Sequence, residues 1–171
     1  ALVILTIPSA SAQYTTHLRT VELNDYNQVT INTDVNVILK KSTRNQISFA
    51  GDSTSIFSIQ VDQLDGMLTF DYVKIEKDTL AIIIIEYNDL KKITTGGTGT
   101  YYFPKLELDN LVIVNPEANI HMSGYTNALR IFSRKGVNDL TDLISNKMIL
   151  QIGDEATLID PSNKNLFSSL D

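Results

Sequence analysis

The chain has 171 residues, the size of one folded domain or one repetitive stack. Hydrophobic residues make up 43% and charged residues 20%, a balance that favours a packed interior over disorder. The net charge of -6 gives no overall basic character, so we expect neither nucleic acid nor an anionic membrane as a partner. Because the chain has no cysteine and only two histidines, disulfides, thiolate nucleophiles and multi-histidine metal sites are excluded, and we expect no metal or cofactor.

The N-terminal segment resembles an export signal. Ala1 to Ile7 is uncharged and almost wholly apolar, and an A-x-A pattern of the kind cut by signal peptidase follows just before Gln13. We interpret residues 1–12 as the remnant of a secretory signal peptide and residues 13–171 as one domain; the alternative is a short buried strand. Since the apolar run is too short to span a bilayer and Gln13 stands where a lipoprotein needs cysteine, we expect an exported protein of the periplasm or cell surface, with neither a transmembrane segment nor a lipid anchor.

Downstream of Tyr14 the sequence predicts an all-β protein, with no convincing amphipathic helix. Apolar residues alternate with polar residues on both sides of a break at Thr33-Asp34, which is typical of half-buried strands. The alternating apolar residues are Val29, Ile31, Val35, Val37, Leu39, Ile47 and Phe49.

Two further strand signals follow. Ile56, Ile59 and Val61 lead to Asp65-Gly66, a dipeptide that favours a hairpin turn, and residues 67–72 return on the other side. Residues 80–85 are apolar on both faces and contain four consecutive isoleucines, which disfavour a helix. We therefore predict that residues 80–85 form a strand buried on both sides and away from a sheet edge.

The second half of the chain is repetitive. Residues 94–100 read T-T-G-G-T-G-T, and we expect a flexible loop there. From Leu106 onward short strand-like segments recur, with asparagines at positions 110, 127, 146 and 163, so that successive spacings are 17, 19 and 17 residues. A period just under twenty with two or three short strands per turn predicts a β-solenoid, in which each coil buries its apolar row by stacking on the next.

These features together resemble a known family. The cysteine-free chain with its export signal, the segment Val29-x-Ile31 followed by Asp34-Val35-x-Val37, the L-D-G-x-L segment at residues 64–68 and the later coils are similar to the bacterial head GIN domain family. The resemblance runs from about Leu18 to the C-terminus. It implies early hairpins, a right-handed parallel β-helix-like solenoid, export, and adhesion or scaffolding at the cell surface, with no established active site.

Two departures from the family pattern matter. Glycine-serine-glycine turns between coils are mostly missing, and the sequence stops partway through a coil at residues 166–171. A solenoid with an uncapped end exposes strand edges, so we expect either that the native chain continues or that this end pairs with another chain.

Three adjacent aromatic residues, Tyr101, Tyr102 and Phe103, form the candidate binding site. They follow the glycine-rich segment directly, and aromatic rings beside a loop can stack on a sugar or on a partner protein. The alternative is an apolar lid on the solenoid.

Support in the sequence for a catalytic site is weaker. Glu107 and Asp109 are two residues apart on an expected strand, which places both carboxylates on one face, and paired carboxylates perform glycoside hydrolysis. The alternative is a solvated outer face. His17 and His121 are far apart in sequence, and Ser123-Gly124 beside His121 is a turn signal without the G-x-S-x-G pattern of a nucleophile elbow.

The sequence therefore predicts a non-catalytic, exported cell-envelope protein, an adhesin or surface-binding module whose partner is a protein or a glycan. The alternative is a polysaccharide lyase or hydrolase on a β-helix scaffold. A third hypothesis is self-association through open strand edges.

Overall fold

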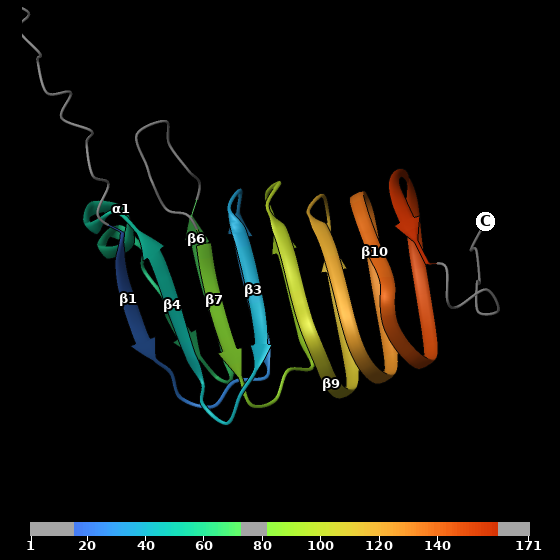
Figure 1. The fold of residues 1–171 in the computed structure, drawn as a ribbon, viewed down its shortest axis with the longest axis horizontal. Helices are drawn as coiled ribbons and strands as arrows, with labels where there is room; N and C mark the ends of the chain where they lie inside the picture. The colour runs from blue at the N-terminus through green and yellow to red at the C-terminus, as the bar shows by residue number, and fades with distance from the viewer. Residues whose placement is uncertain (1–15, 73–81, 161–171) are drawn as a thin grey trace, which may run out of the picture.

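The computed structural model describes residues 16–72 and 82–160. The proposed signal remnant, Asn163 and the C-terminal residues 166–171 lie outside these ranges. Within them the chain is almost entirely β-structure, as predicted, and one ten-stranded sheet curls into an open, half-barrel shape (Figure 1). The elements are β1 (His17–Glu22), β2 (Gln28–Thr33), β3 (Asn36–Lys41), β4 (Gln46–Gly51), α1 (Ser53–Ser58), β5 (Asp62–Leu64), β6 (Met67–Tyr72), β7 (Ile82–Tyr87), β8 (Lys92–Gly96), β9 (Thr100–Asn115) and β10 (Asn119–Ile159).

Two long strands bend and so connect different parts of the sheet. The sheet order is β1-β4-β7-β3-β9-β8-β2-β6-β5, with β10 added on β9. The start of β9 pairs with β3 at Tyr101, whereas its end pairs with β8 at Val112. One continuous strand therefore crosses from one side of the half-barrel to the other.

Beyond β9 the chain repeats its path. Asn119 of β10 pairs in parallel with Thr100 of β9, and Ser133 pairs with Asn115, so the chain returns after 19 and then 18 residues. This return length agrees with the 17- to 19-residue spacing of the asparagines. The successive turns of the ribbon are visible toward the C-terminal end of Figure 1.

The N-terminal half stacks in the same way but not in chain order. β2 pairs in parallel with both β6 and β8, and β3 pairs in parallel with both β7 and β9. The early hairpin expected for the segments at Val29 and Val37 is wrong, because β2 and β3 are neighbours in sequence that pair with different strands. The tight turn at Asp34 and Val35 carries the chain from one side of the half-barrel to the other.

The Asp65-Gly66 hairpin is confirmed. β5 and β6 are antiparallel with Leu64 opposite Met67, and Asp65 and Gly66 both have positive φ, 49° and 77°. These angles match the turn that suits the twist of a two-residue hairpin.

The apolar residues Ile56, Ile59 and Val61 ahead of the hairpin do not lie in a strand. Ile56 lies in the short helix α1, whose first turn is capped by Asp52, since the carboxylate accepts a hydrogen bond from the Ser55 amide at 3.0 Å. An aspartate three residues ahead of an amide is a local helix-start signal that can override an apolar strand-like pattern.

The isoleucine run forms β7, which lies between β4 and β3 and is therefore not an edge strand. The prediction that this strand is buried on both faces is wrong for the part that the structure describes. Ile83 and Ile85 are buried, whereas Ile82 and Ile84 on the other face are half-buried. Leu80 and Ala81 lie outside the described residues.

The threonine-glycine segment is mostly ordered sheet and tight turn, so a flexible loop is wrong. Thr94 and Thr95 belong to β8, and the chain turns at residues 97–99 into β9. A Cβ atom at Gly99 would overlap the carbonyl oxygen of Val35, so this turn packs directly on the Asp34-Val35 turn. Glycine is needed there for close approach of two backbones.

One contiguous core fills the half-barrel. Along most strands other than β1 and β5, buried residues alternate with more exposed ones, and the buried ones include Phe49, Leu68, Ile85, Phe103 and Ile131. No helix in the described ranges is long and apolar enough to cross a membrane.

Candidate binding site

Strand alternation separates the three predicted aromatic residues. Tyr101 is 0% and Phe103 is 1% exposed, and both pack in the core, whereas Tyr102 is 39% exposed. The three rings do not form one surface, because successive side chains of a strand point to opposite faces. Ligand binding by Tyr102 stays a prediction.

Tyr102 has a stacking partner that the sequence did not reveal. In the parallel register, His121 of β10 lies beside Tyr102 of β9, and the two rings stack with centroids 5.3 Å apart and planes 16° apart. His121 Nδ1 in turn lies 3.3 Å from Oδ2 of Asp139, which is 18 residues further along β10. Three successive coils therefore align a phenol, an imidazole and a carboxylate in one outward row.

The Asp139 carboxylate is fixed by local hydrogen bonds. Its Oδ1 accepts from the Thr141 hydroxyl at 2.6 Å and from the Thr141 amide at 3.1 Å. These bonds, together with the contact to His121, hold the pKa of Asp139 below its usual range. The carboxylate is thus held charged and in place beside His121.

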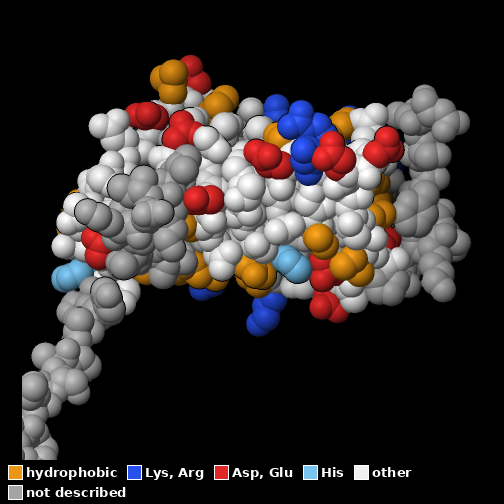
Figure 2. Space-filling view, turned by 90° about the horizontal axis from the view of Figure 1, so that it is seen from above, with side chains coloured by type: hydrophobic (Ala, Val, Ile, Leu, Met, Phe, Trp, Pro, Cys, Tyr) orange, Lys and Arg blue, Asp and Glu red, His pale blue; other side chains and the backbone are white. Residues whose placement is uncertain are grey.

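A shallow recess of about 210 Å³ adjoins this row. Its lining combines aromatic, apolar and acidic side chains: Tyr102, Phe103, Pro104, His121, Met122, Ser123, Asp139 and Asp142. In Figure 2, hydrophobic, histidine and acidic side chains lie side by side on one margin of the C-terminal half. An exposed ring next to charged acceptors is a combination that suits a sugar or a peptide.

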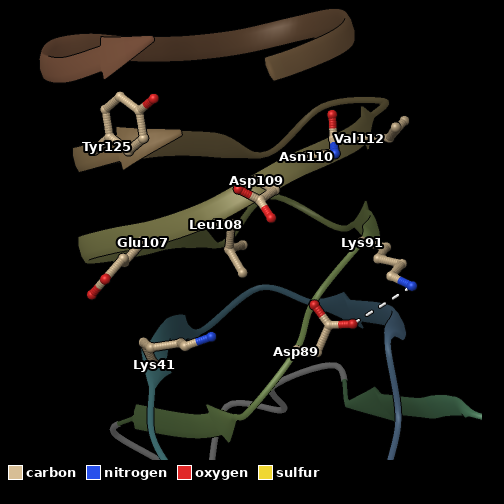
Figure 3. Close-up of a pocket in the computed structure, with 9 residues that line it drawn as sticks. All are labelled: Lys41, Asp89, Lys91, Glu107, Leu108, Asp109, Asn110, Val112 and Tyr125. Atoms are coloured by element: carbon tan, nitrogen blue, oxygen red, sulfur yellow. Dashed lines mark ion pairs between the residues drawn. The ribbon is translucent and has the colours of Figure 1, made fainter. Parts of the chain in front are cut away.

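A larger hollow of about 720 Å³ contains the two carboxylates that the sequence singled out. Glu107 and Asp109 are both exposed and come from the middle of β9. Figure 3 shows the Glu107 carboxylate directed away from Asp109, and Asp109 directed toward the side where Asp89 and Lys91 form an ion pair of 3.7 Å. The two acids share the hollow but do not converge on one point in it.

Tyr125 borders the same hollow and belongs to a polar network. Asn146 Nδ2 donates to the Tyr125 hydroxyl at 2.8 Å and to Asn127 Oδ1 at 2.9 Å. The asparagine spacing in the sequence contained a signal for this network. The hydrogen bond to Tyr125 was not predictable, because it depends on how successive turns of β10 stack on one another.

The other catalytic candidates are not brought together. His17 lies on β1, at the far end of the strand order from β10. The Ser123 hydroxyl accepts a hydrogen bond from the Lys105 amide at 3.1 Å, and His121 faces Asp139. Among the described residues, no three histidine, aspartate or glutamate side chains gather to hold a metal ion.

The sequence matches a family described as "Putative auto-transporter adhesin, head GIN domain" over residues 25–153. The chain belongs to the head GIN domain family. No protein of curated function shows a significant match to its sequence.

Several solved structures have a similar fold. A "putative adhesin" from Bacteroides fragilis is 18% identical with a TM-score of 0.60, and the match covers 81% of this chain and 76% of that one. A "putative adhesin" from Parabacteroides merdae is 14% identical with a TM-score of 0.56, covering 84% and 80% of the two chains. A third, from Parabacteroides distasonis, is 14% identical with a TM-score of 0.56, covering 82% and 79%. At these identities the likeness concerns the fold alone.

Proposed function

We propose that this head GIN domain protein is an exported, non-catalytic binding module of the bacterial cell envelope. Its scaffold is a right-handed parallel β-solenoid, and its ligand is a glycan or a protein segment that stacks on Tyr102. The observation that carries the proposal is the outward row of Tyr102, His121 and Asp139, which joins a recess on one side of the molecule.

The row has the properties of a binding surface. His121 covers one side of the Tyr102 ring and fixes its orientation, so little side-chain entropy is lost when a ligand contacts it. The charged Asp139 beside it offers a hydrogen-bond acceptor to hydroxyl or amide groups of the ligand. All three side chains lie on strands of the sheet, which hold them more rigidly than loops would.

The geometry of the acids favours binding over catalysis. Hydrolysis of a glycosidic bond by a carboxylate pair requires two groups that face the same bond, one of them protonated through burial. Glu107 and Asp109 are both exposed, and their carboxylates point in different directions (Figure 3). A polysaccharide lyase or hydrolase remains the alternative function, and a product released from a polysaccharide would identify it.

The experiment is a glycan and peptide array probed with the wild-type chain and with Tyr102→Ala. We expect the variant to lose at least tenfold in affinity for whatever the wild type binds, because an aromatic anchor is removed. Leu64→Ala is the matched control, since Leu64 is an exposed apolar side chain on β5, 75% accessible and outside the recess. Equal binding by Tyr102→Ala and wild type would reject this site.

A further inference from the structure

One outer face of the molecule differs in charge from the rest. We define the basic face as the outward side of β8, of the end of β9, and of the two β10 segments stacked beyond them. Its outward residues alternate with core residues such as Ile93, Ile113 and Ile131. They include four exposed basic side chains and four half-buried apolar ones: Lys92, Arg130, Arg134, Lys147, Val112, Val114, Phe132 and Ile149.

The parallel register brings these residues together. Lys92 lies beside Val112, Val112 beside Arg130, and Val114 beside Phe132 on adjacent strands. Adjacent strands are about 4.8 Å apart, so neighbouring side chains are in contact range. We call the four apolar residues the apolar strip. The cations are interspersed with it, since Lys92 and Arg130 lie on either side of Val112.

The surface of the strip is hollowed in two places. A depression of about 300 Å³ is lined by Val112, Ala128, Arg130, Lys147 and Ile149 with their neighbours. A second, of about 390 Å³, is lined by Val114, Pro116, Phe132, Arg134 and Gly153 with theirs. No acidic residue lines either depression.

Four acidic residues of the C-terminal half lie away from this face. Glu107, Asp109, Asp139 and Asp142 line the recess and the hollow of the candidate binding site. Glu155 pairs with Lys135 at 2.8 Å next to the basic face, and its carboxylate also interacts electrostatically with Arg134. Figure 2 shows Lys and Arg side chains gathered on the margin opposite the histidine of the C-terminal half, with acidic side chains close to them. Basic residues therefore line the two depressions without an acidic one, although the net charge of the chain is -6.

We propose that the basic face binds the surface of a membrane that contains anionic lipids. The cations attract the head groups, and the apolar strip lies against the upper acyl chains, the two contributions on which peripheral membrane binding depends. A nucleic acid fits less well, because single strands bind through stacked aromatic rings and this face has only the Phe132 ring. The surface is separate from the Tyr102 recess, so the inference does not depend on the proposed function.

The test is cosedimentation with vesicles of phosphatidylglycerol and phosphatidylcholine, compared with vesicles of phosphatidylcholine alone. We expect binding to the anionic vesicles only. Arg130→Gln/Lys147→Gln is expected to weaken this binding roughly 30-fold, since each basic residue near an anionic surface contributes about fivefold. Phe132→Thr is expected to weaken it at all salt concentrations, whereas the effect of the two cations declines as salt screens them.

The matched control is Arg44→Gln/Lys105→Gln. It changes the net charge by the same amount at two exposed residues that do not line either depression of the basic face. Binding that falls equally in both double variants would show an effect of net charge and overturn the proposal. Absence of binding to anionic vesicles, or tighter binding to a single-stranded oligonucleotide with the same variant dependence, would overturn it as well. The four basic side chains substituted in the two double variants are exposed, so circular dichroism is expected to show unchanged folding for both.

Discussion

The Thr95 hydroxyl donates a hydrogen bond of 2.6 Å to Oδ1 of Asn115 inside the core. The same oxygen accepts from the Ala118 amide at 2.9 Å, and Asn115 Nδ2 donates to the Ala118 carbonyl at 2.8 Å and toward the Ser133 hydroxyl at 3.3 Å. Asn115 thus closes the turn that follows β9 and connects it to the coils on either side. Buried polar groups that are fully bonded in this way define one register between coils.

Asn115→Ala is expected to destabilise the fold by about 1–3 kcal/mol or more, because it leaves the Thr95 hydroxyl and the Ala118 backbone without their buried partner. Urea unfolding followed by circular dichroism measures the loss. Asn110→Ala is the control, since Asn110 is exposed at the preceding corner, and a change within about 0.5 kcal/mol is expected for it. Equal losses in the two variants would show that the buried network contributes nothing specific.

Gly99→Ala is expected to destabilise the protein more than Gly66→Ala. A Cβ at Gly99 would overlap the Val35 carbonyl oxygen and force two stacked turns apart, whereas a Cβ at Gly66 meets nothing within 4 Å. Gly66→Ala then costs only the backbone strain of its positive φ, about 1–2 kcal/mol. Thermal unfolding of both variants measures the difference, and a Gly66 variant that melts at the lower temperature would contradict the stacking of the turns.

Alkaline pH is expected to unfold the protein through its buried tyrosines. Burial raises the pKa values of the Tyr26, Tyr87 and Tyr101 phenols well above the ordinary value. The unfolded chain loses these protons near pH 10 while the folded chain keeps them, so stability is present below about pH 10 and falls as the pH rises further.

Spectrophotometric titration of the seven tyrosines measures this. We expect one group of tyrosines that ionises reversibly and a second that ionises only together with loss of the β-sheet signal. A single reversible transition for all seven would contradict the burial of these three rings.

Asp139→Asn is expected to remove an acid-sensitive contribution to stability. The folded pKa of Asp139 is depressed, so its contribution is fully present above the unfolded value of about 3.9 and is lost as the pH falls through the lower folded value. Wild type and variant are therefore expected to differ at neutral pH and to converge in strong acid. A constant difference down to the lowest pH would indicate that the carboxylate charge is not involved.

The sequence predicted the features that depend on local patterns. Three features were predicted correctly: the alternation at Val29 and Ile31, the Asp65-Gly66 turn, and the coil length after Leu106. Each depends on a regular spacing or a short residue pattern that is present in the sequence itself. The repeat before Leu106 could not be predicted from the sequence. In the sheet, β2 lies between β6 and β8, and β3 lies between β7 and β9, so the order of the strands in the stack differs from their order in the chain. A permuted order of coils leaves no constant period.

The candidate site was predictable only in part. The aromatic composition at 101–103 indicated a ring surface, but the same alternation that identified strands elsewhere implies that only Tyr102 faces outward. The partners His121 and Asp139 lie 19 and 37 residues away and meet Tyr102 through the register of two coils. The net charge led to the expectation of no anionic partner, because composition does not show that two surface depressions are lined by basic residues and no acidic one.

The most direct test of the central claim is to incubate the ligand that the wild-type chain binds on the array with that chain, and to analyse the ligand afterwards by mass spectrometry. We predict a ligand that binds through Tyr102 and is recovered chemically unchanged. Release of shortened or unsaturated products, lost in Glu107→Gln or Asp109→Asn, would contradict a binding module and identify the protein as an enzyme.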